Sequence, residues 1–559
     1  DYLSDIKEIN IRINCKILIM KKILYILLIG LFSSCDSLLD VEPETLVSFD
    51  NFYKSEQDLE VTLYQLHSFI NGRLMDQHVQ EEAGLIMEPN TTRNNIWSPS
   101  SIVGSPAVGS IQTDWMQIYW VVYMANVLLD NVYKAEAQVT PDRIAYYKAQ
   151  AYFGKAIGYF FLARRWGEVT ITRNSSSSEV YGKKPLLEVL DTVLANATRA
   201  YHELPVYGAV VDRSGAVIKS KQFGSKGAAC ALLAHAYAWK GSMIDLMELD
   251  GNSRECYDKS IEYSSLLIKG DAGAYSLVRN PEKLCQLFSD ITKENPESIW
   301  EFTLDMQRDF ISSTYLVGRQ LIGYPVDPAV SESDQKNADS KISYKTIKQL
   351  YDTLDLRTAY FYKYDYYSCD TLRLQGIKDE ALRQHAVDSI RKRINEITGG
   401  YAYPFKWREA ITEVDANIPW ISKLVAVKSN YSYWRLADIY LLRAECFAKI
   451  GENGLAEADL NEIREYNNVN AYPDSGGDEK GLKYAIFHER ERELLMEGQR
   501  FFDIVRNGME YINAYLPSDF QKLTRQDVKN GAIFFPICTN AFELNNLLRQ
   551  NIYWAQYMN

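Results

Sequence analysis

The chain has 559 residues, of which 47% are hydrophobic and 24% charged, and its formal net charge at pH 7 is −12. That acidity, without a basic patch interleaved with aromatic residues, argues against a nucleic acid as partner. The length suffices for a large core in one big domain or two fused domains. The 39 Tyr and 10 Trp residues help to bring the aromatic share to 13%, which suits sugar-stacking surfaces and the aromatic cores of helical solenoids alike.

An export signal is predicted near the N-terminus. Lys21 and Lys22 follow Met20 and precede a ten-residue apolar run at 23–32, and two serines then lead to Cys35. These are the features of a signal peptide, and the apolar run is too short to cross a bilayer as a helix. The Leu-Phe-Ser-Ser-Cys sequence ending at Cys35 resembles the lipobox of bacterial lipoproteins. We predict cleavage before Cys35 and lipid attachment to its thiol; an ordinary secretory signal with an incidental Cys is the alternative.

The N-terminal end is therefore divided into three parts. We expect residues 1–19 to precede the true start, 20–34 to be the signal peptide and 35–48 to be a lipidated tether. Acyl chains on Cys35 would hold the chain at a membrane without spanning it.

The first helix is predicted to begin after Ser55, a plausible N-cap with Asp58 three residues later. A polar, irregular segment follows at 71–114, and a loop of this length is usually functional or disordered. In it Trp97 is preceded by a guanidinium and two amides, those of Arg93, Asn94 and Asn95. A stacking platform beside such groups suits a sugar site, so these four residues are the first candidates for ligand binding.

Helical periodicity returns after this loop and predicts paired helices. We expect helices at 115–137, 141–166 and 187–202, and an Ala-rich helix from 224 that pairs with 256–269. The repeats lack a clean 34-residue period, so residues 49–276 are predicted to form a degenerate, TPR-like helical-hairpin solenoid.

From residue 277 to 428 the helical pattern weakens, and we predict a loop-rich, mixed subdomain inserted into the solenoid. Its aromatic residues Tyr324, Trp407 and Trp420 are further candidates for ligand binding. For any one of these aromatics a core role is at least as consistent with the sequence as a ligand role.

Residues 429–559 hold the densest pattern. The apolar face at Ala437, Leu441 and Ala444, followed by Gly451 as a C-terminal cap and Asn453 as the next N-cap, predicts a helical hairpin. A charged helix follows at 487–503. Its charges indicate either a solvated face or a buried network of arginines and carboxylates that ties the helix to Arg435, Glu445 and Arg464.

Three motifs in this region carry a resemblance to a known family. They read R-x-A-D-I-Y-L-L-R-A-E from residue 435, L-N-x-I-R from 460 and E-R-x-x-E-L-x-x-E-G-x-R-x-x-D from 489. In this order and spacing they resemble the C-terminal signature of the SusD/RagB family of outer-membrane nutrient-binding lipoproteins of Bacteroidetes. The resemblance implies a mainly α fold, as the periodicity does. It extends to the tail, where Cys538 stands in place of a proline of the family pattern.

The resemblance also implies a function. Family members bind nutrient at the cell surface and act as a lid over a SusC-like TonB-dependent outer-membrane transporter, so this chain is expected to capture glycans, facing the extracellular side, and to deliver them to such a partner. A peptide-binding member of the family is the alternative, and a scaffolding TPR protein is more remote. The family's ligand residues vary and lie in loops, so no motif transfers them.

Catalysis and cofactors are not expected. His488-Glu489 begins like a zinc-binding H-E-x-x-H, but Arg492 occupies the second ligand position, and the cysteines show no metal spacing. A glycoside hydrolase that uses Glu489 and Glu493 is a distant alternative. It is disfavoured because neighbouring arginines would hold these carboxylates ionised, whereas a general acid needs a raised pKa.

Overall fold

A computed structural model describes residues 52–74, 114–304, 325–326, 341–351, 354–362, 377–414, 422–516 and 521–557. The chain divides into two units, residues 1–54 and 55–559. The described part of the second unit is mainly helical, as predicted.

The first half of this unit is a series of antiparallel helices. Ser55 caps the first of them, because its backbone N–H and its hydroxyl both donate to the Asp58 carboxylate, at 2.9 and 2.8 Å. Each of the later helices packs on the next one along the chain, which confirms the predicted hairpins. The elements are α3 (Glu56–Phe69), the π-helix η1 (Ile70–Leu74), α6 (Met116–Asn131), the 3-10 helix η2 (Val132–Ala135), α7 (Pro141–Trp166), α8 (Leu186–Glu203), α9 (Lys226–Met247) and α10 (Ser253–Lys269).

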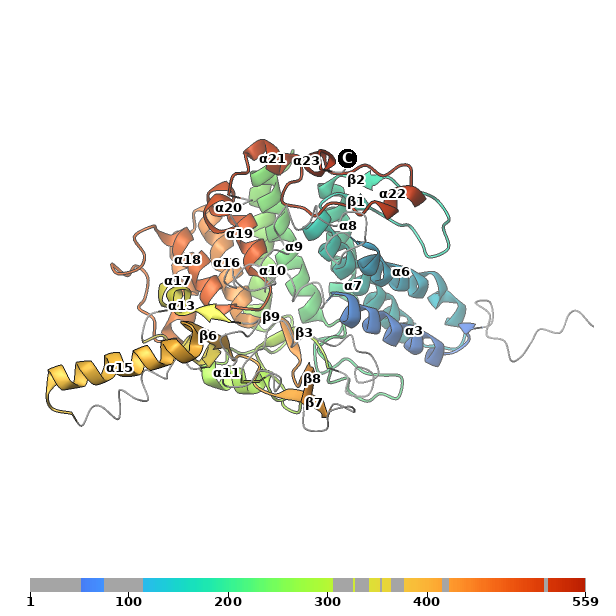
Figure 1. Ribbon diagram of the computed structural model, residues 1–559. Helices are drawn as coiled ribbons and strands as arrows, with labels where there is room; N and C mark the ends of the chain where they lie inside the picture. Colours follow the sequence, from blue (N-terminus) through green and yellow to red (C-terminus); the bar gives the residue numbers. More distant parts are fainter. Residues whose placement is uncertain are drawn as a thin grey trace, which may run out of the picture. The chain divides into compact units, whose positions relative to one another are not determined.

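The helical stack continues with helices that are far from α10 along the sequence. Helix α16 (Leu436–Ile450) packs directly on α10 (Figure 1), and α17 (Asn453–Tyr466) and α18 (Leu482–Glu493) pack on α16. Helix α9 also reaches α16, since Ala234 and Ala238 of α9 share one buried cluster with Leu442 and Cys446 of α16. Gly451 ends α16 with φ +89°, a left-handed conformation that favours glycine. Asn453 is the first residue of α17 rather than its N-cap, which is Glu452.

The segment between α10 and α16 is the mixed insert that the sequence predicts. Its two ends meet, because β3 (Ser298–Phe302) pairs antiparallel with β9 (Tyr431–Arg435). Between them β4 (Ile342–Ser343), β6 (Tyr401–Pro404) and β5 (Phe361–Tyr362) form a three-stranded sheet, and β7 (Ala410–Val414) pairs with β8 (Ser422–Val427). The insert also holds α11 (Pro281–Phe288), α13 (Tyr344–Leu350), the 3-10 helix η4 (Leu356–Tyr360) and α15 (Glu380–Thr398).

An aromatic core joins the strand pair to the solenoid. Trp300 of β3 and Trp434 of β9 are opposite each other in the register, with ring centroids 5.4 Å apart. Phe153 of α7 contacts Trp300, and His235 of α9 stacks on Trp434 at 5.3 Å. Burial of rings of this size is a main source of stability. The strand pair β3–β9 therefore fixes the two ends of the insert to the solenoid.

The C-terminal tail returns to α7. The Phe535 N–H donates to the Arg165 carbonyl at 2.6 Å, and the Trp166 indole donates to the Pro536 carbonyl. Next to them Gly167 has φ +70°, and a Cβ there would meet the Phe534 ring at 2.8 Å. The remaining helices are α19 (Arg500–Asn507), α20 (Met509–Tyr515), α21 (Arg525–Lys529), α22 (Asn540–Leu544) and α23 (Ile552–Ala555), and a two-stranded ladder is formed by β1 (Val169–Thr170) and β2 (Lys183–Lys184). Within the described ranges no helix is both long and apolar enough to cross a membrane.

Candidate functional site

Most of the predicted ligand residues lie outside the described residues. This holds for Trp97 and its neighbours Arg93, Asn94 and Asn95, for Tyr324 and Trp420, and for the predicted lipidation site Cys35. Their roles stay predictions, and so do the domain boundaries.

Trp407 is described, and its surroundings do not suit an open stacking platform. Its exposed fraction is 3%. Phe288 of α11 stacks on it at 6.0 Å, and Tyr431 of β9 stacks on it at 5.5 Å. Trp407 therefore packs the insert against the strand pair. The expectation that it offers a surface for sugar was wrong, because aromatic neighbours already contact its ring.

The ends of two predicted ligand-bearing segments are tied together. Residues 75–113, which include Trp97, follow η1, and residues 305–324, which end with Tyr324, follow β3. The Asn71 amide of η1 donates to the Thr303 carbonyl at 2.6 Å. The buried Gln222 side chain bridges the same two ends, since its amide donates to the His67 carbonyl at 2.7 Å and its oxygen accepts from the Thr303 N–H at 3.0 Å. We call this junction the loop stem.

Exposed aromatic rings lie close to the loop stem. Trp120 and Tyr123 of α6 are 41% and 36% exposed, and Trp120 contacts Phe69, the last residue of α3. In the sequence these residues look like part of an ordinary amphipathic helix, and the sequence analysis missed them. The signal was there, because Met116, Trp120 and Tyr123 recur at i, i+4 and i+7 and so share one helical face.

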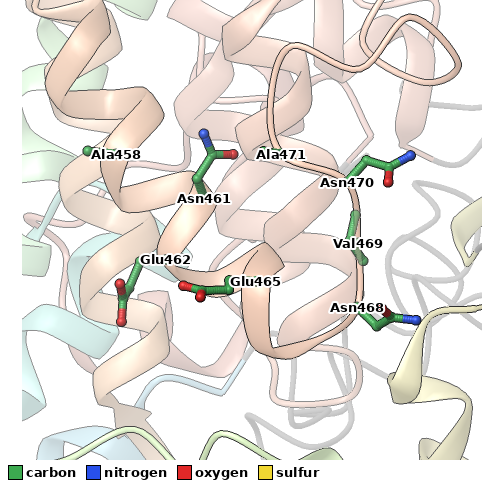
Figure 2. Close-up of a pocket in the computed structure, with 8 residues that line it drawn as sticks. All are labelled: Ala458, Asn461, Glu462, Glu465, Asn468, Val469, Asn470 and Ala471. Carbon is green, nitrogen blue, oxygen red and sulfur yellow. The ribbon is translucent and has the colours of Figure 1, made fainter.

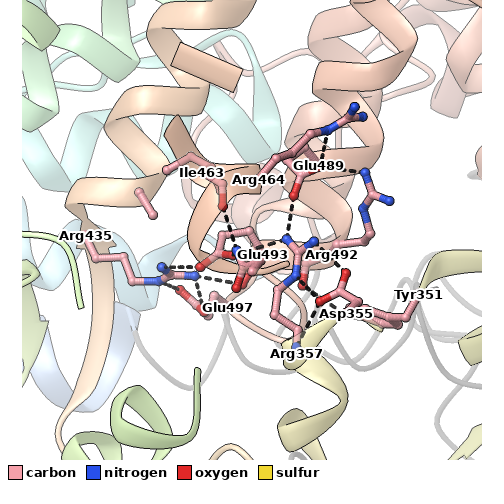
Figure 3. Close-up of polar contacts among 12 residues, drawn as sticks. Tyr351, Asp355, Arg357, Arg435, Ile463, Arg464, Glu489, Arg492, Glu493 and Glu497 are labelled. Atoms are coloured by element: carbon pink, nitrogen blue, oxygen red, sulfur yellow. Dashed lines mark hydrogen bonds and ion pairs between the residues drawn. The ribbon is translucent and has the colours of Figure 1, made fainter. Parts of the chain in front are cut away.

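The charged helix α18 takes part in two buried ionic clusters, which confirms the network interpretation over the solvated face. The first, the Glu493 cluster, lies where the insert meets the C-terminal helices (Figure 3). Arg357 and Arg435 both contact Glu493, at 3.2 and 2.9 Å, and Arg435 also contacts Glu297 at 2.6 Å. Its members are Glu297, Asp355, Arg357, Lys406, Arg435, Arg464, Asp478, Glu489, Arg492, Glu493 and Glu497.

The second, the Arg490 cluster, joins α18 to α9, α16 and α19. Arg490 donates to Asp438 at 2.7 Å and to Asp503 at 2.9 Å. The His235 Nε2 lies 2.8 Å from the Asp438 carboxylate, and Arg506 forms a two-pronged pair with Glu445 at 2.9 and 2.8 Å. Burial lowers the pKa of His235, which favours the neutral imidazole, and Arg490 compensates the Asp438 charge.

The protonation of the clusters argues against acid catalysis. Burial alone would raise the pKa of Glu489, but Arg357, Arg492 and Arg464 lower it to about 2. Burial likewise opposes ionisation of Glu493, yet Arg435, Arg357 and Lys406 hold its pKa below the usual range. A glycosidase needs one carboxyl that keeps its proton and is open to substrate. Glu489 and Glu493 are almost fully buried, so they suit a structural role.

Glu297 is the carboxyl with the opposite shift. Burial raises its pKa, and Glu493 adds to the rise, while Arg435 opposes it. Both oxygens are occupied: one contacts Arg435, and the other accepts the Val278 N–H at 2.9 Å. A carboxyl so enclosed has no room to protonate a leaving group.

A cleft of about 600 Å³ lies between α17 and the loop that follows it (Figure 2). Several of the side chains that line it already form hydrogen bonds or ion pairs with other parts of the protein. Asn461 exchanges hydrogen bonds with the Tyr472 backbone, Glu462 pairs with Arg279, and the Asn468 amide donates to the Leu354 carbonyl. No aromatic ring lines the cleft, so it offers no stacking surface for a sugar.

Metal and thiol chemistry each require a particular arrangement of acidic, histidine or cysteine side chains. The described ranges contain no group of three or more His, Cys, Asp or Glu side chains arranged to hold a metal ion. Cys230, Cys256, Cys285, Cys446 and Cys538 are buried and free. Burial raises the pKa of Cys230 and Cys446, the latter to about 12, which makes them poor nucleophiles.

Two family models match the chain. One described as "SusD family" matches residues 247–554. The other, described as "Starch-binding associating with outer membrane", matches residues 39–237. The first covers the insert and the C-terminal motifs, and the second covers the N-terminal helices.

Individual relatives agree with these models. The SusD-like protein P25 of Formosa agariphila is 23% identical over 521 residues, which cover 87% of this chain and 89% of that protein. The starch-binding protein SusD of Bacteroides thetaiotaomicron is 26% identical over 292 residues, 46% of this chain and 49% of that protein. The crystal structure of a SusD homologue from the same organism has a TM-score of 0.65 at 20% identity, over 89% of this chain and 98% of that one. Because the first family model matches more than half of its residues, the chain belongs to the SusD family.

Proposed function

We propose that this protein is a lipid-anchored, cell-surface glycan-binding protein without catalytic activity, which hands its ligand to a SusC-like TonB-dependent transporter. Family membership and the starch-binding description of the matching model support the ligand class. The same description associates the family with the outer membrane. The lipobox-like sequence at Cys35 supports the anchor.

The loop stem is the observation that carries the proposal. Two segments far apart in the sequence, each with a candidate aromatic residue, begin at backbone positions joined by Asn71, Gln222 and Thr303. Binding residues gather on loops that a rigid scaffold positions. Here the scaffold is the end of α3 and the end of β3. The segments that contain Trp97 and Tyr324 therefore both start from the loop stem.

Peptide binding is the second candidate. It draws on the same loops, and the described residues do not favour it: the cleft beside α17 has an acidic lining with partners already in place. Glycan binding is preferred because the aromatic residues near the loop stem supply flat apolar surface with a polar edge.

Replacing Trp97 tests where the glycan binds. We expect Trp97→Ala to weaken glycan binding by about tenfold, since loss of one stacking ring costs roughly 1.4 kcal/mol. The measurement is the migration of the full chain in native gels that contain soluble starch, laminarin, xylan, pectin or galactomannan. Tyr133→Ala is the matched control, because Tyr133 is an exposed ring of η2. Equal retardation of Trp97→Ala and the wild type would place the ligand away from this loop.

A further inference from the structure

We infer that Trp120 and Tyr123 of α6 form an additional sugar-stacking platform that extends the proposed glycan site from the loop stem onto the solenoid. The inference rests on the proposed function, since it assigns described residues to the same ligand class. These residues belong to a regular helix rather than to a loop.

The two rings form a corner. Their centroids are 5.6 Å apart and their planes cross at 89°. Phe69 of α3 supports Trp120 from the neighbouring helix at 6.1 Å with a tilt of 40°. A Trp residue that is supported by a neighbouring ring and is 41% exposed overall is a firm surface for the apolar face of a pyranose, and the perpendicular Tyr123 ring limits sliding.

The polar edges of the platform are available. Neither the Trp120 indole N–H nor the Tyr123 hydroxyl forms a hydrogen bond within the described part of the chain, whereas the half-buried Tyr119 of the same helix donates its hydroxyl proton to the Thr170 carbonyl at 2.7 Å. A sugar hydroxyl can accept from the indole and exchange a bond with the phenol.

The position of the platform connects it to the predicted loop site. Phe69 lies two residues before Asn71, which binds Thr303. Helices α3 and α6 pack side by side (Figure 1). A glycan chain longer than one unit that binds near the loop stem therefore has an aromatic contact on α6.

A protein partner is the other occupant to consider, and the size of the patch disfavours it. A stable protein interface buries about 800 Å² on each side, from some 20–30 residues. The platform consists of two rings with Met116 one turn before them. Such a small apolar strip matches a sugar unit better than a protein surface.

The test uses the full chain in the same five polysaccharide gels. For the polysaccharide that retards the wild type, we expect Trp120→Ala and Tyr123→Ala each to weaken binding by about tenfold. Trp120→Phe should retain most of the retardation because it keeps a ring, and Tyr133→Ala should bind like the wild type. Thermal unfolding of each variant identifies any loss of fold, and Tyr123→Ala and Trp120→Phe keep the test valid if Trp120→Ala does not fold.

The other outcomes separate the two claims. If Trp97→Ala loses binding while Trp120→Ala and Tyr123→Ala bind like the wild type, the proposed function stands and the platform is refuted. Normal glycan binding by Trp120→Ala together with loss of co-purification with the transporter would assign the face to a protein contact and also refute it. If none of the five polysaccharides retards the wild type, both claims fail.

Discussion

Arg435→Met is expected to lower the free energy of unfolding by about 3–5 kcal/mol, the usual cost of removing one partner from a buried ion pair. Arg435 is fully buried and contacts three carboxylates, those of Glu297, Glu493 and Glu497, at 2.6, 2.9 and 2.8 Å. Methionine fills a similar volume but leaves these carboxylates without that positive charge. The measurement is urea or guanidinium unfolding at neutral pH.

A matched control separates burial from charge. Arg525 pairs with Glu248 at the surface, and both side chains are 53% exposed. Arg525→Met should change stability by less than about 1 kcal/mol, because exposed ion pairs contribute little. A loss below about 1 kcal/mol for Arg435→Met as well would contradict the view that the Glu493 cluster holds the insert to the solenoid.

Acid is expected to destabilise the protein below about pH 4.5. The pKa values of Glu489 and Glu445 are about 2 in the folded chain, against an ordinary value of 4.5. Burial alone would raise both pKa values. Arg357, Arg492 and Arg464 lower the pKa of Glu489, and Arg506 lowers that of Glu445. Because the folded pKa is depressed, this stabilisation is complete above pH 4.5 and is lost as pH falls toward 2. A shift of this size corresponds to about 3 kcal/mol for each group.

Other carboxyls act in the opposite direction. Burial raises the pKa of Glu297 and of Glu301, so these groups take up a proton more readily in the folded state and offset part of the loss. Denaturant midpoints at pH 7, 4.5 and 3 measure the net effect. We expect a clear drop between pH 4.5 and 3, reduced in Glu445→Gln, which cannot titrate at that position. A midpoint that stays constant or rises over this range would contradict the assignment.

Much of the fold can be predicted from the sequence because its determinants are local. Helix α7 spans the predicted range 141–166, with Pro141 in the first turn. Gly451 gives the turn of the α16–α17 hairpin, and small residues on one face of α16 indicate a close helix partner. The same logic could not show that α16 packs on α10, because the whole insert separates them.

The ionic network was predicted only in part. Arg435 and Arg464 belong to the same sequence region as α18, so their pairing with it could be expected. Arg357 and Lys406 come from the insert, and Arg357 contacts Glu489, which is 132 residues away. Neither residue stands in a recognisable pattern, so only the tertiary structure reveals that the insert contributes positive charges to the C-terminal motif.

For the aromatic residues, the sequence does not show which rings are buried and which are exposed. Composition alone cannot distinguish the roles of Trp407, Trp97 and Trp120, since each is a large ring in a chain rich in such rings. Trp407 packs in the core, while Trp120 remains 41% exposed on a helix. The difference depends on how the neighbouring rings contact the indole: Phe288 and Tyr431 both stack on Trp407, whereas Phe69 contacts Trp120 at a tilt of 40° and Tyr123 contacts it edge-on.

The central claim is that the ligand is a glycan that is bound and not cleaved. The most direct measurement compares the full chain in native gels with each of the five polysaccharides and with a mixture of tryptic peptides, and then analyses the chain length of the recovered polysaccharide. We predict retardation by at least one polysaccharide, none by the peptides, and an unchanged chain length. Binding to peptides alone would contradict the claim, and so would shortening of a polysaccharide that Glu493→Gln abolishes while the fold is retained.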